Sequence, residues 1–450
     1  MLRLIVADLA ANARIWLGIL LLTLAVGGVG GIAAGLVETG RFYGGEAEEG
    51  LVSVSMVVVM FTGVTALTVL TASANLTVTL QRRGYALWQL AGLPPAAVGA
   101  VVLAQLFLVA VLGASVGCLA VAPAGQPFFD YVFADWSELE GVRVYYGPVS
   151  MVAVVVAVTA VVVLGGLRGA RQASRVAPIE ALREPEPARA RMGALRWLLA
   201  SGLLAGLIGL GAGLEGATFT VISSQAMFVT PLIIALLASL GPALYPLLLR
   251  GWTAVLPRRA SASWFLARNA AAHRLSQSTA TIGPLMVAVA LTGGLYTAAQ
   301  TLGGAVELQT GRTAGYDLAP EGIVMMLGGP LLLSAVAAAA TVFMSGHARD
   351  RDFALMQAAG ASHRTILTAA VWEAVIHLVT AVLLAAAAIG AGGLITAWAL
   401  SATIPGVTAS FALAPPAVIA AGGLVLVLAA TVIPTVAALR QDVARSLAAS

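Results

Sequence analysis

Lysine is missing from this chain, because all 24 basic residues among its 450 are arginine. A nucleotide-binding P-loop needs the lysine of Gly-x-x-x-x-Gly-Lys-Ser/Thr, so no segment of this sequence can form one. Cysteine occurs once, at Cys118, which excludes a disulfide framework and a thiolate metal cluster. The four histidines are scattered along the chain and are best explained as structural residues. The sequence therefore predicts no enzyme activity, metal or cofactor of its own.

Charge is scarce: 10% of the residues are charged and 60% are hydrophobic, with a mean hydropathy of +0.96. This composition is typical of an all-α membrane protein, in which an uncharged run of ~20 residues crosses the bilayer as one helix. The sequence predicts ten such spans, at about 15–37, 51–80, 97–122, 147–167, 194–214, 225–249, 278–300, 322–345, 366–398 and 414–438.

The distribution of arginine predicts the orientation. If both termini are cytoplasmic, all the arginines except Arg41, Arg143 and Arg312 lie on the inner side. Basic residues gather on the cytoplasmic side of membrane proteins, which favours this topology in a bacterial plasma membrane. The basic balance therefore reflects topology and gives no support for nucleic-acid binding. The N-terminal stretch is a short amphipathic lead into the first span and shows no small-residue cleavage site, so we expect it to be retained.

One ten-residue segment occurs twice. Arg-Gly-Tyr-Ala-Leu-Trp-Gln-Leu-Ala-Gly at 83–92 recurs as Arg-Asp-Phe-Ala-Leu-Met-Gln-Ala-Ala-Gly at 351–360, a constant offset of 268 residues. Each copy lies between two long apolar segments, so the sequence predicts a short helix at the inner membrane surface in each half. Spans one to four and seven to ten then form two parallel four-helix units, at 1–192 and 256–450, and spans five and six at 193–255 connect them.

Each repeated helix should end at a glycine, Gly92 or Gly360, in the left-handed C′ position. Ser362 should then supply the N-cap oxygen of span nine. Aromatic and apolar side chains lie one turn apart on one face, where they could form a knob for a groove in a soluble partner. The alternative is an interfacial helix whose aromatic rings rest among the lipid headgroups. The residues expected to contact the partner are Arg83, Tyr85, Leu87, Trp88, Arg351, Phe353, Leu355 and Met356.

A second motif follows span four, within the segment Arg-Val-Ala-Pro-Ile-Glu-Ala-Leu-Arg. Together with the repeated helix, it resembles the FtsX-type permeases of ABC transporters. The ten-span layout is most similar to the BceB-like branch and to two-unit permeases of actinobacteria, within a superfamily that includes the BceB-like and MacB-like branches. The matching residues include Arg175, Pro178, Glu180, Leu182 and Arg183. A large outer domain of the kind found in those branches is missing from this sequence.

The resemblance implies a permease subunit that works with a separate cytoplasmic ATPase, expected as a dimer, which binds the ATP and pushes on the two repeated helices. The movement would export or extract an amphipathic substrate, such as a peptide antibiotic, a drug or a lipid, with an accessory membrane protein or lipoprotein as a further partner. Antibiotic resistance is one role that such a transporter serves.

Glu373 is a carboxylate well inside a predicted span, with His377 one turn further on the same face. A charge at membrane depth costs a few kcal/mol, which makes Glu373 a candidate functional residue. The repeat offset places Gln105 at the equivalent position of the first unit. A hydrogen bond between neighbouring spans explains this pattern better than proton coupling, and both readings stay open.

Glycines form a GxxxGxxxG stripe at Gly27, Gly31 and Gly35, and a shorter one at Gly202 and Gly206. Small residues let helices approach closely in a membrane, so we expect packing within the chain, with a dimer contact as the alternative.

Two other functions fit parts of the sequence. One is a scaffold that moves no substrate and regulates an outer-surface enzyme or a sensor kinase. The other is a proton-coupled transporter that uses Glu373, which would need more titratable groups within the membrane than this chain has.

Overall fold

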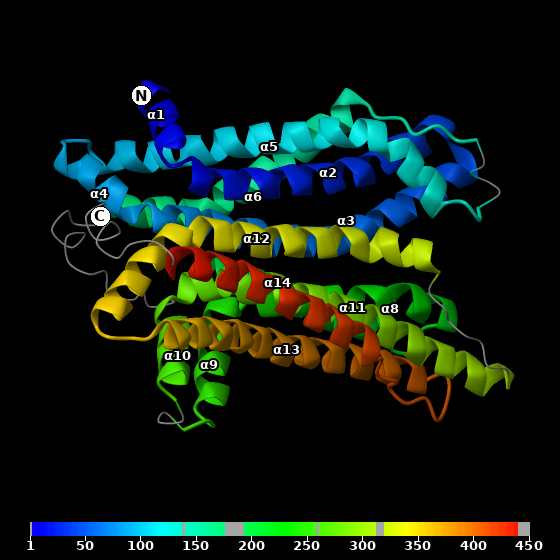
Figure 1. The fold of residues 1–450 in the computed structure, drawn as a ribbon. Coiled ribbons are helices and arrows are strands. Elements are labelled where there is room, and N and C mark those ends of the chain that lie inside the picture. Colours follow the sequence, from blue (N-terminus) through cyan, green and yellow to red (C-terminus); the bar gives the residue numbers. More distant parts are fainter. Residues whose placement is uncertain are drawn as a thin grey trace.

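A computed structural model describes residues 2–136, 139, 141–175, 193–257, 261–311 and 319–439. Within these ranges the regular structure is helical, with no β-strand (Figure 1). The helices are α1 (Leu2–Ala11), α2 (Ala13–Tyr43), α3 (Gly45–Leu80), α4 (Arg82–Leu90), α5 (Pro95–Val132), α6 (Pro148–Arg175), α7 (Ala194–Leu214), α8 (Phe219–Ser239), α9 (Gly241–Thr253), α10 (Ala262–His273), α11 (Leu275–Thr310), α12 (Pro320–Ala358), α13 (His363–Ser401) and α14 (Ala414–Leu439).

Ten helices of the described chain are long and apolar enough to cross a membrane, which confirms the predicted all-α membrane fold with ten spans. They are α2, α3, α5, α6, α7, α8, α11, α12, α13 and α14. Several of them continue past the predicted ends, because the apolar run limits the membrane segment and not the helix. Helix α5, for example, continues through Pro123 and Pro127 to Val132.

The predicted sixth span at 225–249 is wrong in its boundaries. Helix α8 ends at Ser239, and α9 begins at Gly241 with Pro242 in its first turn. Proline lacks a backbone N–H and its ring clashes with the preceding turn, so Pro242 favours a new helix start over continuation.

The two halves of the bundle have the same helix contacts. In the first half α2 contacts α3, α5 and α6, and in the second half α11 contacts α12, α13 and α14. Helix α6 contacts α3 and α5, as α14 contacts α12 and α13. Between the halves α3 packs on α12, while α2 contacts α12 and α11 contacts α3. Equivalent helices thus make equivalent contacts in the two halves, and α3 and α12 lie side by side where the halves meet (Figure 1).

The connecting helices break this symmetry. Helix α8 packs against α11 and α13 of the second half, and α7 packs mainly against α8. As a result 94% of the apolar window of α11 is buried, compared with 50% for α2, its equivalent.

An interfacial helix precedes the first span of each half. Helix α1 contacts α2 and α5, and α10 contacts α11 and α13. The sequence predicts α1 only as an amphipathic lead and does not predict α10. The start of α10 carries a recognisable signal, since the Ser261 side chain accepts a 3.0 Å hydrogen bond from the Trp264 backbone N–H as an N-cap.

Candidate coupling helices and intramembrane polar groups

Helix α4 ends in the turn that the sequence predicts. Gly92 has a φ of +96°, in the left-handed region. Its N–H donates to the Gln89 carbonyl at 3.0 Å, and the Leu93 N–H donates to the Trp88 carbonyl at 3.0 Å. This pair of hydrogen bonds defines a Schellman motif, in which glycine avoids the strain that a Cβ would introduce.

The second copy of the repeat makes the same turn. Gly360 has a φ of +89°, and its N–H donates to the Gln357 carbonyl at 2.9 Å. The Ala361 N–H donates to the Met356 carbonyl at 2.9 Å. The predicted left-handed glycine is therefore confirmed in both copies.

A new helix follows each turn at once. In the first half Pro94 is extended and Pro95 opens α5. In the second half Ser362 is the N-cap of α13, and its Oγ accepts a 3.2 Å hydrogen bond from the Thr365 N–H. Both surface segments are thus joined to the next span through a short, hydrogen-bonded connection.

The two copies differ at their beginnings. Helix α4 is separated from α3 by Gln81, whereas the second copy forms the C-terminal part of α12. The expectation of a separate second helix is therefore wrong. No described residue between 341 and 359 has a positive φ and that segment contains no proline, so the helix is continuous through it, although its end turns away from the rest of α12 (Figure 1). Figure 1 shows α4 and this end of α12 at the same end of the bundle.

Tyr85 does not form the outward knob that the sequence predicts. Its side chain is 1% exposed and belongs to the core of the first half, and its hydroxyl donates a hydrogen bond to the Gln81 Oε1. Burial raises the pKa of Tyr85, with the Asp8 carboxylate adding to the shift. The Trp88 ring packs edge-on at 5.3 Å and is itself half-buried. A short helix at a membrane surface must bury one face, and the aromatic face of α4 is the buried one.

Leucine occupies the outward face instead. Leu87 is 52% exposed, and Leu355, its counterpart 268 residues later, is 50% exposed. Leu90 and Arg83 are exposed on the same side of α4. Met356 is half-buried. Leu87 and Leu355 are among the contact residues that the sequence predicts, but the sequence does not show that they face outward while the aromatic side chains of α4 are buried.

Other predicted site residues lie partly or wholly outside the described structure. Helix α6 ends at Arg175, whose side chain is not described, and the side chains of Arg351 and Phe353 in α12 are not described either. The remaining motif residues, Pro178, Glu180, Leu182 and Arg183, lie outside the described residues.

Gln105 is fully buried in α5 and donates a 2.8 Å hydrogen bond from Nε2 to the Asp8 Oδ2 of α1. The second oxygen of Asp8 accepts a 2.9 Å hydrogen bond from Asn12. Burial raises the pKa of Asp8, although both hydrogen bonds act in the opposite direction. This contact ties the N-terminal helix to the span that follows α4.

Glu373 and His377 are both buried in α13. His377 Nε2 lies 3.1 Å from Ser278 Oγ, and that hydroxyl donates a 2.9 Å hydrogen bond to the carbonyl of Ala271 in α10. Because the Ser278 hydroxyl donates its proton to the Ala271 carbonyl, it accepts the hydrogen bond from His377, and Nε2 is the protonated ring nitrogen. The histidine thus links α13 to the corner between α10 and α11. Among the described residues no group of three His, Cys, Asp or Glu side chains lies together as a metal site.

The glycine stripe of α2 packs within the chain, as the sequence favours. A Cβ at Gly27 would lie 2.5 Å from the Ala114 carbonyl oxygen, and one at Gly117 would lie 2.1 Å from the Leu24 carbonyl oxygen. Gly31 faces Cys118, whose thiol donates to the Gly27 carbonyl at 3.3 Å. Glycine is needed here because α2 and α5 are in backbone contact.

These features define a multi-pass membrane protein whose two surface segments are joined directly to spans. Residues 324–443 match the family model described as FtsX-like permease C-terminal. This segment begins in α12 and includes the turn at Gly360, α13 and α14. No curated protein and no solved structure matches the chain. The match supports a permease of the ABC-transporter type, a family of membrane permeases that generally work with an ATPase and are not catalytic enzymes.

Proposed function

We propose that this protein is the permease subunit of an ABC transporter and that a dimer of a separate cytoplasmic ATPase binds its two repeated segments. The observation that carries the proposal is the pair Leu87 and Leu355. Each is about half exposed, each lies one turn before a Schellman turn, and the two segments lie at the same end of the bundle. Two equivalent apolar contacts suit a partner with two equivalent grooves.

The absence of lysine supports a separate ATPase, because this sequence cannot contain a P-loop. The match to FtsX-like permeases supports the same conclusion, since that family generally works with an ATPase. With the repeated segments on the cytoplasmic side, both termini are cytoplasmic and the arginine-rich loops face inward, as the positive-inside rule favours.

The coupling would be mechanical. A short, hydrogen-bonded turn joins α4 to α5 and the end of α12 to α13, so a displacement of either surface segment moves the following span with it. When the ATPase dimer closes, the two pushes reach α5 and α13, which occupy equivalent places in the two halves. The substrate is an amphipathic molecule, such as a peptide antibiotic, a drug or a lipid, which the two halves export or extract from the membrane.

Pull-down of the ATPase on the membrane protein tests the proposal. Leu87→Asp and Leu355→Asp place a charge in the apolar contact and should each abolish or strongly weaken binding. Val255→Asp is the control, because Val255 is exposed just after α9 and lies outside the repeat. Retention of full ATPase binding by the double variant Leu87→Asp/Leu355→Asp would contradict the proposed docking site.

A further inference from the structure

The outer end of the first half contains an ordered segment that plays no part in the proposed coupling. Helix α5 continues through Gln126 and Asp130 to Val132. After it, residues 142–147 return along α2 and α5 to the start of α6, and we call this segment the strap. It lies at the opposite end of the bundle from α4 (Figure 1).

Side chains from both helices hold the strap in place. Gln126 donates from Nε2 to the Val142 carbonyl at 3.1 Å, and its Oε1 accepts from the Val144 N–H at 2.8 Å. The Tyr145 N–H donates to Thr39 Oγ1 of α2 at 2.9 Å, and the Gly147 N–H donates to the Glu38 carboxylate. Backbone groups that no sheet or helix satisfies are therefore paired, which fixes the strap relative to α2 and α5.

Tyr146 of the strap fills a space made by two glycines. A Cβ at Gly35 would lie 2.5 Å from its ring, and a Cβ at Gly125 would overlap its hydroxyl. Burial raises the pKa of Tyr146, so the phenol stays neutral in this space. Hydrogen bonds and the packing of Tyr146 therefore both hold the strap in place, and the surface that it forms with α5 is preorganised.

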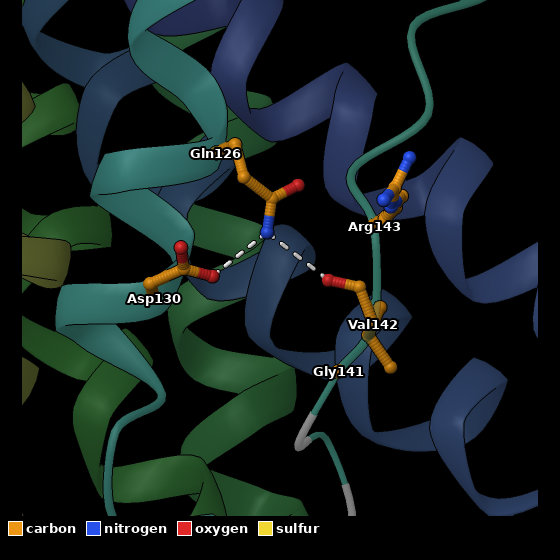
Figure 2. Close-up of a pocket in the computed structure, with 5 residues that line it drawn as sticks. All are labelled: Gln126, Asp130, Gly141, Val142 and Arg143. Atoms are coloured by element: carbon orange, nitrogen blue, oxygen red, sulfur yellow. Dashed lines mark hydrogen bonds between the residues drawn. The ribbon is translucent and has the colours of Figure 1, made fainter.

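Two adjoining hollows open on this surface. The larger, about 580 Å³, lies among Gln126, Asp130 and strap residues that include Arg143. Figure 2 shows Gln126 bridging the hollow, with Asp130 on the helix and Val142 and Arg143 across from it on the strap. The smaller, about 260 Å³, has aromatic walls. Asp130 and Gly141 line both.

Aromatic rings form a continuous wall beside Asp130. Phe129 and Phe133 have ring centroids 4.7 Å apart, and Phe133 and Trp136 are 5.6 Å apart, edge to face. Trp136 remains 46% exposed. An exposed indole face attracts organic cations, and a neighbouring carboxylate strengthens that preference.

We infer that the two hollows form one binding site for an amphipathic organic cation, with the charged group at Asp130 and the apolar group against Phe133 and Trp136. Gln126 holds one oxygen of Asp130 at 2.7 Å and so orients the carboxylate. Arg143 lies across the larger hollow and repels a cation from the strap side, which directs the charged end of the ligand toward Asp130.

This inference deepens the proposed function, on which it rests for the view that the ligand is a transported substrate. The site lies in the outer part of the first half, where a transporter would receive or release an amphiphile. Within the described residues the second half has a strap-like segment near Ser410, held by Thr297 and Thr301, but neither of the hollows described above involves it.

Binding of radiolabelled tetraphenylphosphonium to the purified full chain in nanodiscs of zwitterionic lipid tests the site, with empty nanodiscs as the background. Asp130→Asn and Trp136→Ala should each weaken binding roughly fivefold, since an exposed ion pair and the packing of an aryl group on an indole ring each contribute on the order of 1 kcal/mol. Asp135→Asn is the matched control, because Asp135 is exposed on the same segment but lines neither hollow. Radiolabelled tetraphenylborate, which has the same shape and the opposite charge, is assayed separately because the two ions precipitate together, and it should bind no more than it does to empty nanodiscs.

Wild-type affinity in both Asp130→Asn and Trp136→Ala would overturn the inference, as would binding of tetraphenylborate as tight as that of tetraphenylphosphonium. An equal loss in Asp135→Asn would overturn it too, because it would reduce the effect to general surface charge. The assay contains no ATPase, so a failure here leaves ATPase docking standing. A failed ATPase pull-down, conversely, leaves the ligand site standing.

Discussion

Gln105 and Asp8 are joined by a 2.8 Å hydrogen bond that ties α5 to the N-terminal helix α1. The second half has a similar link, because His377 of α13 reaches α10 through Ser278. In both halves the span that follows the coupling turn is therefore fastened to the interfacial helix that precedes the first span. A push on the coupling turn would reach that interfacial helix as well as the span.

Asp8 should make stability depend on pH. Burial raises its pKa above the usual 3.8, so the folded protein binds this proton at a higher pH than the unfolded chain does. The free energy of unfolding should thus be higher below both pKa values and fall as the pH rises from 3.8 through the folded pKa. Asp8→Asn should lack this component while keeping an acceptor for Gln105. Thermal unfolding of both proteins between about pH 4 and pH 7 tests the difference, and identical pH profiles would contradict it.

Tyr85 and Leu87 should give opposite phenotypes. Tyr85→Ala removes a fully buried ring and should lower the free energy of unfolding by about 3 kcal/mol, as large-to-small core changes do. Leu87→Ala removes an exposed side chain and should leave stability within about 0.5 kcal/mol of wild type while weakening ATPase binding. Thermal unfolding and pull-down on the same preparations separate the effects. A Tyr85→Ala protein that is as stable as wild type but no longer binds the ATPase would instead support a direct contact between Tyr85 and the partner.

The sequence predicts the number of spans, the two coupling turns and the N-cap at Ser362, because each depends on local chemistry: apolar length, a left-handed glycine or a serine oxygen. It does not predict which face of α4 is buried. Tyr85 and Trp88 on one side and Leu87 and Leu90 on the other are all apolar, so periodicity alone cannot choose between them, and the packing of α4 on its neighbours decides.

The sequence does not predict the outer site either. Its lining comes from α5 and a strap whose backbone is held by Thr39, Glu38 and Gln126, and such contacts leave no periodic signal. The proline pair at 123 and 127 suggests a loop, yet α5 continues through both. Pro242, by contrast, does mark a helix boundary, because α9 begins there.

Cysteine labelling tests the orientation. In a Cys118→Ala background, cysteines at Glu48 and Asp135 should react with a membrane-impermeant maleimide from outside, and one at Asn269 only after the membrane is opened. Asp135 and Asn269 are exposed and Glu48 is partly exposed, so access to the reagent from one side of the membrane decides the result. Labelling of Asn269 in intact cells would reverse the proposed topology.

Glu373 should act as a structural residue. It is buried in α13 one turn before His377, which links that helix to the α10–α11 corner. Glu373→Gln keeps the shape and the hydrogen-bonding capacity, so it should lower the melting temperature modestly and retain most ATP-dependent transport. Complete loss of transport by a well-folded Glu373→Gln protein would instead support proton or substrate coupling.

Replacing Gly92 or Gly360 with valine tests the coupling turns. Both glycines have positive φ, which a β-branched residue resists at a cost of about 1–2 kcal/mol, enough to reorient a short segment without unfolding the bundle. No atom lies within 4 Å of a Cβ at either position, so strain in the backbone is the only cause of the effect. Each variant should bind the ATPase yet lose substrate-stimulated ATP turnover. Gly84→Val is the control, because Gly84 lies in α4 with equally open space but has no positive φ. Wild-type turnover in both Gly92→Val and Gly360→Val would mean that motion does not pass through these turns, and the mechanical part of the proposal would fail.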